Sequence, residues 1–259
     1  MAATTLAERS EAVTTYALEH VLDSSHWALP FYNIHLPPWL SLHMVMLVVG
    51  AVLLSGIFAL AFRKKSLVPH GAANALEVMV KFVRDGIAIE NLGEEDGRKM
   101  APLLCSFFFF ILFLNLMGLI PLFATATGNV NVTAGLSLIT LGVMIFGAIY
   151  KNGLGGFLKA FIPHGVPWPV LILLVPIEFM GMFIKTFALT IRLFANMFAG
   201  HIVIFSLIGL VVTYGWVALP AIGLALAIYI LEILVALIQA YVFTLLSAMF
   251  IAQVHHPAH

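Results

Sequence analysis

Charged residues are scarce in this 259-residue sequence, and their scarcity limits the class of protein it can encode. Asp, Glu, Lys and Arg make up 9% of the chain, whereas ordinary soluble domains carry about 25%. Hydrophobic residues make up 62%, and the mean hydropathy is +1.08. A chain of this composition cannot cover a water-facing surface. We therefore expect an integral membrane protein whose main solvent is lipid.

Three further absences exclude other classes. Twelve basic and twelve acidic residues give a formal net charge of zero, so the chain has no excess of basic residues with which to bind nucleic acid. The only cysteine, Cys105, can form no intramolecular disulfide and fits no metal-ligand spacing. The glycine-containing segment 152–156 lacks the Lys-Ser/Thr pair of a phosphate-binding loop. The sequence therefore predicts no cofactor, no metal and no soluble catalytic site.

The N-terminal residues lack the basic start and continuous apolar run of a cleavable signal peptide. We expect the first spanning helix to act as the insertion signal instead. Segment 1–39 is predicted to be interfacial, with a short amphipathic helix followed by Trp27, Phe31, Tyr32 and Trp39. Aromatic residues of this kind are typical of the headgroup boundary.

Apolar segments long enough to cross a bilayer recur along the chain, since a spanning helix needs about 20 residues. We predict one polytopic domain over 1–259. Its membrane segments are 40–62, 100–124, 132–150, 168–216 and 220–254. The fourth segment would be about 70 Å long as a helix, although a bilayer core is about 30 Å thick. The last two should therefore form a long, steeply tilted hairpin.

Basic residues indicate the orientation of the chain. The connector 66–99 is predicted to hold an amphipathic interfacial helix. Together with the three residues before it, this connector carries seven of the twelve Lys and Arg residues. The loop 151–167 carries two more. The positive-inside rule then places both in the cytoplasm, with the N-terminus outside. The fold class predicted is an all-α integral membrane protein with about five membrane-embedded helices, an interfacial amphipathic helix and a cytoplasmic C-terminus.

A polar stripe runs along the first helix of the predicted hairpin. Glu178, Lys185 and Arg192 are seven residues apart, and Asn196 falls on the same face, within about 40° at 3.6 residues per turn. His201 projects from the opposite side. An ionisable residue at the bilayer centre costs about 2.5–3.5 kcal/mol on insertion scales. Residues that costly are usually paired or line a water-filled path.

The second helix of the hairpin places Glu232 and Gln239 on one face, again seven residues apart. Arginine does not lose its proton in proteins, so Arg192 cannot relay protons, but it can hold a carboxylate in its charged form. Histidine titrates near neutrality, and burial moves a glutamate towards that range. His201 and Glu232 are therefore the candidate proton carriers, in either order.

Structural interpretations compete with each of these assignments. A single polar residue in a membrane helix can serve only as interhelical glue, worth about 0.6 kcal/mol; this applies to Asn115, Asn196 and Gln239. Glu178 and Lys185 can simply neutralise each other. We interpret the C-terminal histidines as a polar chain end rather than a metal site.

The segment 191–201, which reads Ile-Arg-Leu-Phe-Ala-Asn-Met-Phe-Ala-Gly-His, resembles subunit a of the F-type ATP synthases. The signature of that family is Arg-Leu-x-x-Asn-x-x-x-Gly followed by an acidic residue or histidine. Segments 115–121, 129–133 and 237–243 give further matches, and order and spacing agree from about Tyr16 onward.

The resemblance implies a proton-translocating stator subunit, itself non-catalytic, beside a rotating ring of c subunits. Arg192 would face the ring carboxylate and separate two aqueous half-channels. Asn196, His201, Glu232 and Gln239 would line the outer half-channel, and Glu178 would belong to the inner exit. Lys185 and Asn115 are further possible members of the path. The implied partners are the c-ring, b-type peripheral stalk subunits and the remainder of the synthase.

One departure concerns His201 and Glu232. Many bacterial relatives have the acidic residue at the first position and histidine at the second, whereas here the pair is exchanged, as in mitochondrial-type members. The exchange should conserve function if the side chains of His201 and Glu232 lie close together. We expect a bacterial-type inner membrane rather than an organelle membrane. The alternative is an ion channel or secondary transporter subunit, but the internal repeats common in transporters are absent from the sequence.

Overall fold

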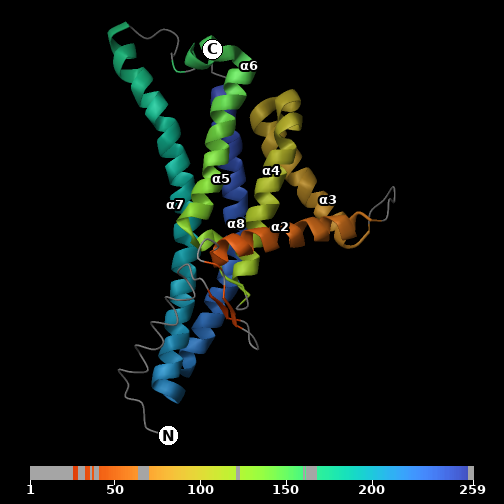
Figure 1. Ribbon diagram of the computed structural model, residues 1–259, viewed down its shortest axis with the longest axis vertical. Coiled ribbons are helices and arrows are strands. Elements are labelled where there is room, and N and C mark those ends of the chain that lie inside the picture. The colour runs from red at the N-terminus through yellow and green to blue at the C-terminus, as the bar shows by residue number, and fades with distance from the viewer. Residues whose placement is uncertain are drawn as a thin grey trace. The chain divides into compact units, whose positions relative to one another are not determined.

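The computed structural model describes residues 26–28, 33–35, 37, 41–63, 70–120, 123–159, 161 and 168–255. The predicted interfacial helix near the N-terminus and the final histidines, 256 and 259, lie outside these residues. The described part of the chain contains five helices long and apolar enough to cross a membrane. The predicted all-α membrane fold is therefore confirmed (Figure 1).

The elements follow one another in a simple order. They are β1 (His26–Ala28), β2 (Asn33–His35), α2 (Leu42–Ala61), α3 (Ala72–Val83), η1 (Arg84–Ile89), α4 (Glu90–Gly118), η2 (Ala126–Gly128), α5 (Val130–Gly142), η3 (Val143–Gly147), α6 (Ala148–Lys159), α7 (Trp168–Tyr214), η4 (Gly215–Ala218) and α8 (Leu219–His255). The two strands pair antiparallel. They were not expected, because three residues are too few to show a strand periodicity.

Helix ends are set by residues that satisfy the free backbone groups there. The Ser41 hydroxyl accepts a hydrogen bond from the Met44 amide at 3.2 Å, and the Asn129 side chain accepts one from the Asn131 amide at 2.9 Å. These are N-caps of α2 and α5. Gly215, with φ of 64°, follows the end of α7 in the left-handed conformation that glycine adopts freely. Pro220 then stands in the first turn of α8, where its missing N–H costs no hydrogen bond.

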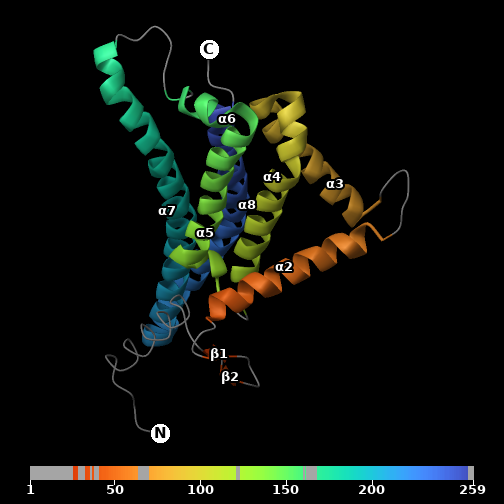
Figure 2. The same cartoon turned by 45° about the horizontal axis from the view of Figure 1, so that its top comes forward.

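The connector before the second span is a helical hairpin rather than a single amphipathic helix. Helices α3 and η1 lead into α4, which reverses at Gly93 with φ 79° and ψ 172° (Figure 2). This conformation is essentially restricted to glycine. A Cβ at Gly97 would lie 2.6 Å from the Ile89 Cα, so the two arms touch at backbone distance. From Met100 onward α4 is mostly apolar, and it ends at Gly118, six residues before the predicted end of the span.

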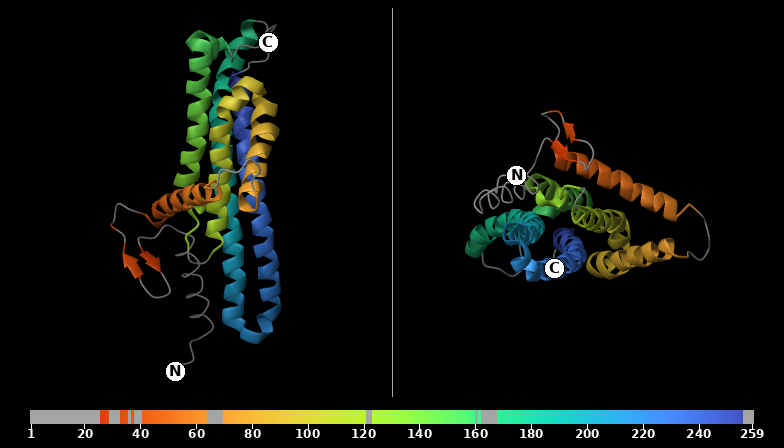
Figure 3. Two further views of the ribbon diagram at one scale, coloured as in Figure 1. Left: turned by 90° about the vertical axis from the view of Figure 1, so that its right-hand side faces the viewer. Right: turned by 90° about the horizontal axis from the view of Figure 1, so that it is seen from below.

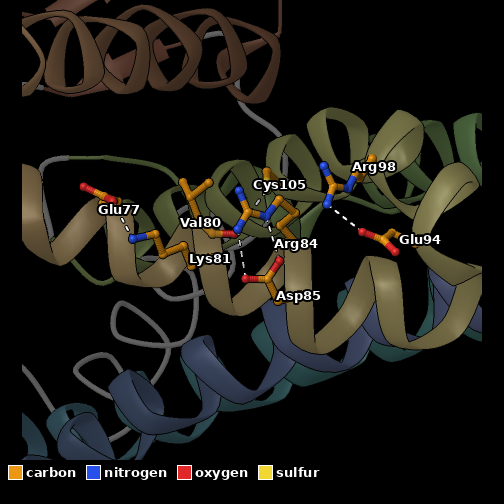
Figure 4. Close-up of polar contacts among 8 residues, drawn as sticks. All are labelled: Glu77, Val80, Lys81, Arg84, Asp85, Glu94, Arg98 and Cys105. Atoms are coloured by element: carbon orange, nitrogen blue, oxygen red, sulfur yellow. Dashed lines mark hydrogen bonds and ion pairs between the residues drawn. The ribbon is translucent and has the colours of Figure 1, made fainter.

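Opposite charges pair along this hairpin (Figure 4). Figure 4 draws the pairs Lys81–Glu77, Arg84–Asp85 and Arg98–Glu94. Lys99–Glu95 is a further pair, and the N–O distances of all four are 2.6 to 2.8 Å. Most of these side chains are exposed, and Glu77 is partly exposed. Exposed pairs contribute about 0–1 kcal/mol each. They fit a surface in water or lipid headgroups and do little to hold the fold.

The chain falls into two compact units, each built from three segments. The first comprises Met1–Leu53, Ile111–Val132 and Arg192–Gln239. Within it, the C-terminal part of α7 and the N-terminal part of α8 run side by side and are joined by η4 (Figure 3). Helix α2 approaches α4 at Gly50, where a Cβ would lie 2.6 Å from Leu114 Cδ2. This glycine therefore allows the close crossing of the two helices.

The second unit comprises Leu54–Phe110, Thr133–Ile191 and Ala240–His259. Here α4, α5 and α8 lie next to one another (Figures 1 and 2). Phe107 of α4 packs edge-on against Phe243 of α8, with ring centroids 5.6 Å apart. The Thr140 and Ser247 hydroxyls are 3.2 Å apart between α5 and α8, and Ser137 of α5 bonds Thr190 of α7. This interior is thus apolar with a narrow seam of hydroxyl groups.

The long C-terminal helices match their predicted extents to within two residues at each end. Many large apolar side chains on α7 and α8 are exposed, as expected of surfaces that face lipid or another membrane subunit. Their tilt in a bilayer stays a prediction.

Candidate functional site

Helix α7 carries the predicted polar stripe and His201 on one continuous helix. Next to Arg192, Leu193 is fully buried, and Met197 is buried one turn later. Arg192 itself is exposed, and Asn196 is partly exposed. No hydrogen bond or ion pair holds the Arg192 guanidinium within the described part of the chain. The arginine therefore stands on the surface of the first unit beside its buried face, available to a group outside this chain.

His201 and Glu232 are brought together, as the sequence predicts. The Glu232 carboxylate is buried at 6% exposure, and a Cβ at Gly200 would lie 1.5 Å from its Oε1 atom. Glu232 thus reaches across from α8 to the α7 backbone at the residue before His201. The two side chains also interact electrostatically. The absent side chain at Gly200 creates the space that the carboxylate occupies.

His201 is held at both ring nitrogens. Its Nδ1 atom is 2.9 Å from the Met197 carbonyl, one turn earlier in α7. Its Nε2 atom is 2.7 Å from the Thr125 hydroxyl and 3.0 Å from the Gly118 carbonyl. The ring therefore bridges α7 to the loop that follows α4. Thr125 was not predicted from the sequence, because nothing in its neighbourhood there points to a histidine 76 residues away.

Two side-chain amides complete the buried polar group of the first unit. Asn115 in α4 is fully buried, and its Oδ1 atom accepts a hydrogen bond from Thr127 at 2.8 Å. Gln239 in α8 is 6% exposed. Asn115 Nδ2, Gln239 Nε2 and Glu232 Oε2 are buried atoms without a protein partner among the described residues. Each such atom costs about 1–3 kcal/mol. Three of them in one unit are groups that internal water could bond.

Tyr229 is a further residue that the sequence did not single out. Its hydroxyl donates to the Leu119 carbonyl at 3.0 Å and so ties α8 to the end of α4. This contact holds the loop that carries Thr125 against the hairpin. The sequence does not mark Tyr229 as part of the site, because a tyrosine in an apolar helix can equally well serve in packing or at the membrane interface.

Lys185 and Glu178 belong to the second unit. The Lys185 ammonium donates to Gln253 Oε1 at 2.5 Å and lies 5.6 Å from the centre of the Phe250 ring. Glu178 is half-buried. Within the described residues there is no direct ion pair between Glu178 and Lys185. Lys185 links α7 to α8 instead.

The described residues contain no group of three or more His, Cys, Asp or Glu side chains arranged to hold a metal ion. The chemistry that the buried cluster of the first unit can perform is proton exchange. Histidine and glutamate both gain and lose protons, whereas the amides and hydroxyls nearby can only orient and pass them. Arg192 supplies a permanent positive charge.

Comparison with known proteins identifies relatives of the chain. A family model described as ATP synthase A chain matches residues 43–252. A protein named ATP synthase subunit a from Anaeromyxobacter sp. (strain Fw109-5) is 49% identical over 222 residues, which cover 83% of this chain and 54% of that protein. Proteins of the same name from Myxococcus xanthus and Chloroherpeton thalassium are 48% and 46% identical, over 83% and 94% of this chain and 73% and 78% of theirs.

The matched region thus spans little more than half the length of the Anaeromyxobacter relative. The family model nevertheless covers three of the five candidate spans completely, all but the first residue of Leu42–Ala61 and all but the last three residues of Leu219–His255. Its final residue, 252, lies near the end of α8. The chain is therefore a multi-pass membrane protein that belongs to the ATP synthase A chain family.

Proposed function

We propose that the chain is the stator subunit through which protons cross the membrane sector of a rotary ATP synthase. The observation that carries the proposal is the burial of Glu232 against Gly200, beside His201, in a unit that also presents Arg192. Two groups able to exchange protons at neighbouring positions of the hairpin, with a fixed cation on the same unit, suit the passage of protons. Family membership makes the same function the natural expectation. By itself the chain would carry out no catalysis.

Arg192 acts as the separator of two half-channels in this proposal. A guanidinium keeps its charge at physiological pH, so it cannot pass a proton along. It attracts an ionised carboxylate, and in this proposal that carboxylate belongs to a neighbouring c-ring subunit. Because Arg192 is exposed on α7, it can meet a group carried by another chain. The arginine thus holds the ring carboxylate charged while no proton is available.

The outer half-channel is built from the polar cluster of the first unit. A proton enters through Glu232 and His201, with Asn196, Gln239 and Asn115 orienting water or the proton itself. The ring carboxylate takes the proton and becomes neutral. An uncharged acid costs far less to bury in lipid than an ion, so the ring can turn away from the stator.

The inner half-channel includes Glu178. A ring carboxyl that completes the turn releases its proton there and is again attracted by Arg192. Lys185 lies in the same stripe, but its ammonium is occupied by Gln253. Each charge carried across the membrane is worth about 2.3 kcal/mol per 100 mV of potential. Several such transfers per turn drive rotation.

The orientation follows from the basic connectors and the number of spans. With both connectors in the cytoplasm, five spans place the N-terminus outside and the C-terminus inside. The partners are the c-ring, b-type peripheral stalk subunits and the remainder of the synthase, with lipid around them. The membrane is a bacterial-type inner membrane, and no nucleic acid is involved.

The test is ATP-driven proton uptake by the complete synthase in sealed vesicles, with the native chain and with Arg192→Ala. The Arg192→Ala complex should assemble but not pump. Arg98→Ala is the matched control, because Arg98 is an exposed arginine in an i, i+4 pair with Glu94; it should pump normally. Undiminished pumping by Arg192→Ala would overturn the proposal.

A further inference from the structure

The loop that follows α4 carries a buried hydroxyl group that the proposed path does not yet use. Thr125 is 7% exposed and lies outside regular structure, just before η2. Its Oγ1 atom lies 2.7 Å from His201 Nε2 and 3.4 Å from the Gly118 carbonyl. A Cβ at Gly118 would be 2.8 Å from the same Oγ1 atom. The glycine therefore allows the threonine to approach the end of α4, and the site is tightly defined.

Backbone carbonyls approach both nitrogens of the His201 ring. The Met197 carbonyl faces Nδ1, and the Gly118 carbonyl faces Nε2. A carbonyl only accepts hydrogen bonds, and a neutral imidazole has only one N–H to donate. Without a further group, these two carbonyls would match the doubly protonated ring alone. A neutral His201 would then leave a nitrogen lone pair facing a carbonyl oxygen.

The Thr125 hydroxyl offsets this conflict because it can both donate and accept, and so gives the Nε2 lone pair a donor. When His201 is neutral, Nδ1–H donates to Met197 and the hydroxyl donates to Nε2. When His201 is charged, Nε2–H donates to the hydroxyl or to Gly118, and the hydroxyl can turn its own proton towards the Gly118 carbonyl. One rotation of the O–H group thus satisfies both protonation states of the ring.

We propose that Thr125 is a positioning residue that lets His201 both take up and release a proton, by rotating its hydroxyl between the ring and the Gly118 carbonyl. The inference rests on the proposed function, in which His201 carries protons. It adds the residue that fixes the tautomer of the neutral ring. Because Nδ1–H is committed to Met197, the nitrogen that exchanges protons is Nε2.

Among the described residues of α8, the acidic side chain that lies next to His201 is Glu232, whose carboxyl group meets the α7 backbone at Gly200. Tyr229, also on α8, bonds the Leu119 carbonyl, next to the Gly118 carbonyl. From the α4 side, the described contacts of the ring are the uncharged Thr125 hydroxyl and the Gly118 carbonyl. From α7 itself, the Phe205 ring lies 6.5 Å away and does not titrate. A change at Thr125 therefore leaves the charges around His201 as they are.

The experiment compares Thr125→Val with Thr125→Ser in the assembled synthase, using proton uptake in vesicles over a range of pH. Valine keeps the shape of threonine but has no hydroxyl, so the protonated ring should be favoured. Uptake should fall about tenfold near neutral pH, with the profile displaced by about one unit towards alkaline pH. Thr125→Ser should restore uptake. Normal uptake by the valine variant, or equal loss in both variants, would overturn the proposal.

A second measurement uses the native protein and does not depend on the assembly of a variant. Nitrogen-15 NMR of labelled histidine should show neutral His201 protonated at Nδ1, whereas protonation at Nε2 would contradict the proposal. The Arg192→Ala complex distinguishes a failure of the role proposed for Thr125 from a failure of the proposed function. Blocked pumping there, with normal uptake in Thr125→Val, removes only the role of Thr125. Normal pumping by Arg192→Ala removes the proposed function itself.

Discussion

Gly200 and Glu232 are in contact across the hairpin: the position of a Cβ on Gly200 lies 1.5 Å from Glu232 Oε1. No side chain can stand at residue 200 while the carboxylate keeps its place. The contact joins α7 to α8 at the point where His201 follows in the sequence. The glycine is therefore part of the proposed proton path, although it has no functional group.

Gly200→Ala should displace the Glu232 carboxylate and slow proton uptake about tenfold or more, because small misplacements of reacting groups have effects of this order. ATP-driven uptake in vesicles measures the effect. Gly181→Ala is the matched control on the same helix, since nothing lies within 4 Å of the added Cβ. The control should pump normally. Equal behaviour of the two variants would show that the Gly200 contact is unimportant.

Exchange of His201 and Glu232, the two proposed proton carriers, should be tolerated. His201→Glu and Glu232→His, made singly, leave two groups of one kind beside Gly200 and should each reduce uptake strongly. The double variant restores one imidazole and one carboxylate and should regain a substantial part of the native rate. The same vesicle assay gives all three values. A double variant as inactive as the single variants would argue against cooperation between the two side chains.

Lys185 should contribute to stability more than to transport. Lys185→Met removes the hydrogen bond to Gln253 and the contact with Phe250. The melting temperature of the complex should fall, in line with a loss of about 1 kcal/mol, while proton uptake stays unchanged. Gln253→Leu should have a similar effect, and the two losses should not add, because they remove one shared interaction. Loss of uptake at full stability would place Lys185 in the path.

Gly93→Ala should destabilise the hairpin formed by α3, η1 and α4. At φ 79° and ψ 172° an alanine is strained by about 1–3 kcal/mol. Gly86→Ala is the control, because the nearest atoms to its added Cβ are in ordinary contact at 3.8 Å. Thermal unfolding of the purified complex compares the two. A Gly93→Ala complex as stable as the control would mean that the hairpin can turn differently.

The sequence is most informative about the long helices. Lipid offers no hydrogen bonds, so backbone groups must pair within each segment, and apolar runs of sufficient length become helices. For this reason the predicted extents of α7 and α8 lie close to the observed ones. The shared face of Glu232 and Gln239 also follows from helical spacing alone, and both side chains are buried.

Features that depend on tertiary contacts could not be predicted in this way. Thr125 meets His201 only because the loop after α4 folds back against α7, and no local pattern specifies that path. The partner of Lys185 is 68 residues away in the sequence, on another helix. The reversal at Gly93 falls inside a segment whose composition suits one amphipathic helix equally well. For Thr125 and Lys185 the deciding interaction lies outside the window of residues that periodicity examines.

The two units differ in how their buried polar atoms are satisfied, and this difference bears on hydration. In the second unit, the hydroxyls of Ser137, Thr186 and Thr190 bond other protein oxygen atoms. In the first unit, buried atoms of Asn115, Glu232 and Gln239 have no such protein partner among the described residues. Water gains little by entering the former and is held by several groups in the latter. The chain thus combines a seam that resists wetting with a cluster suited to internal water, so proton transfer along the cluster should depend on the activity of water around the membrane.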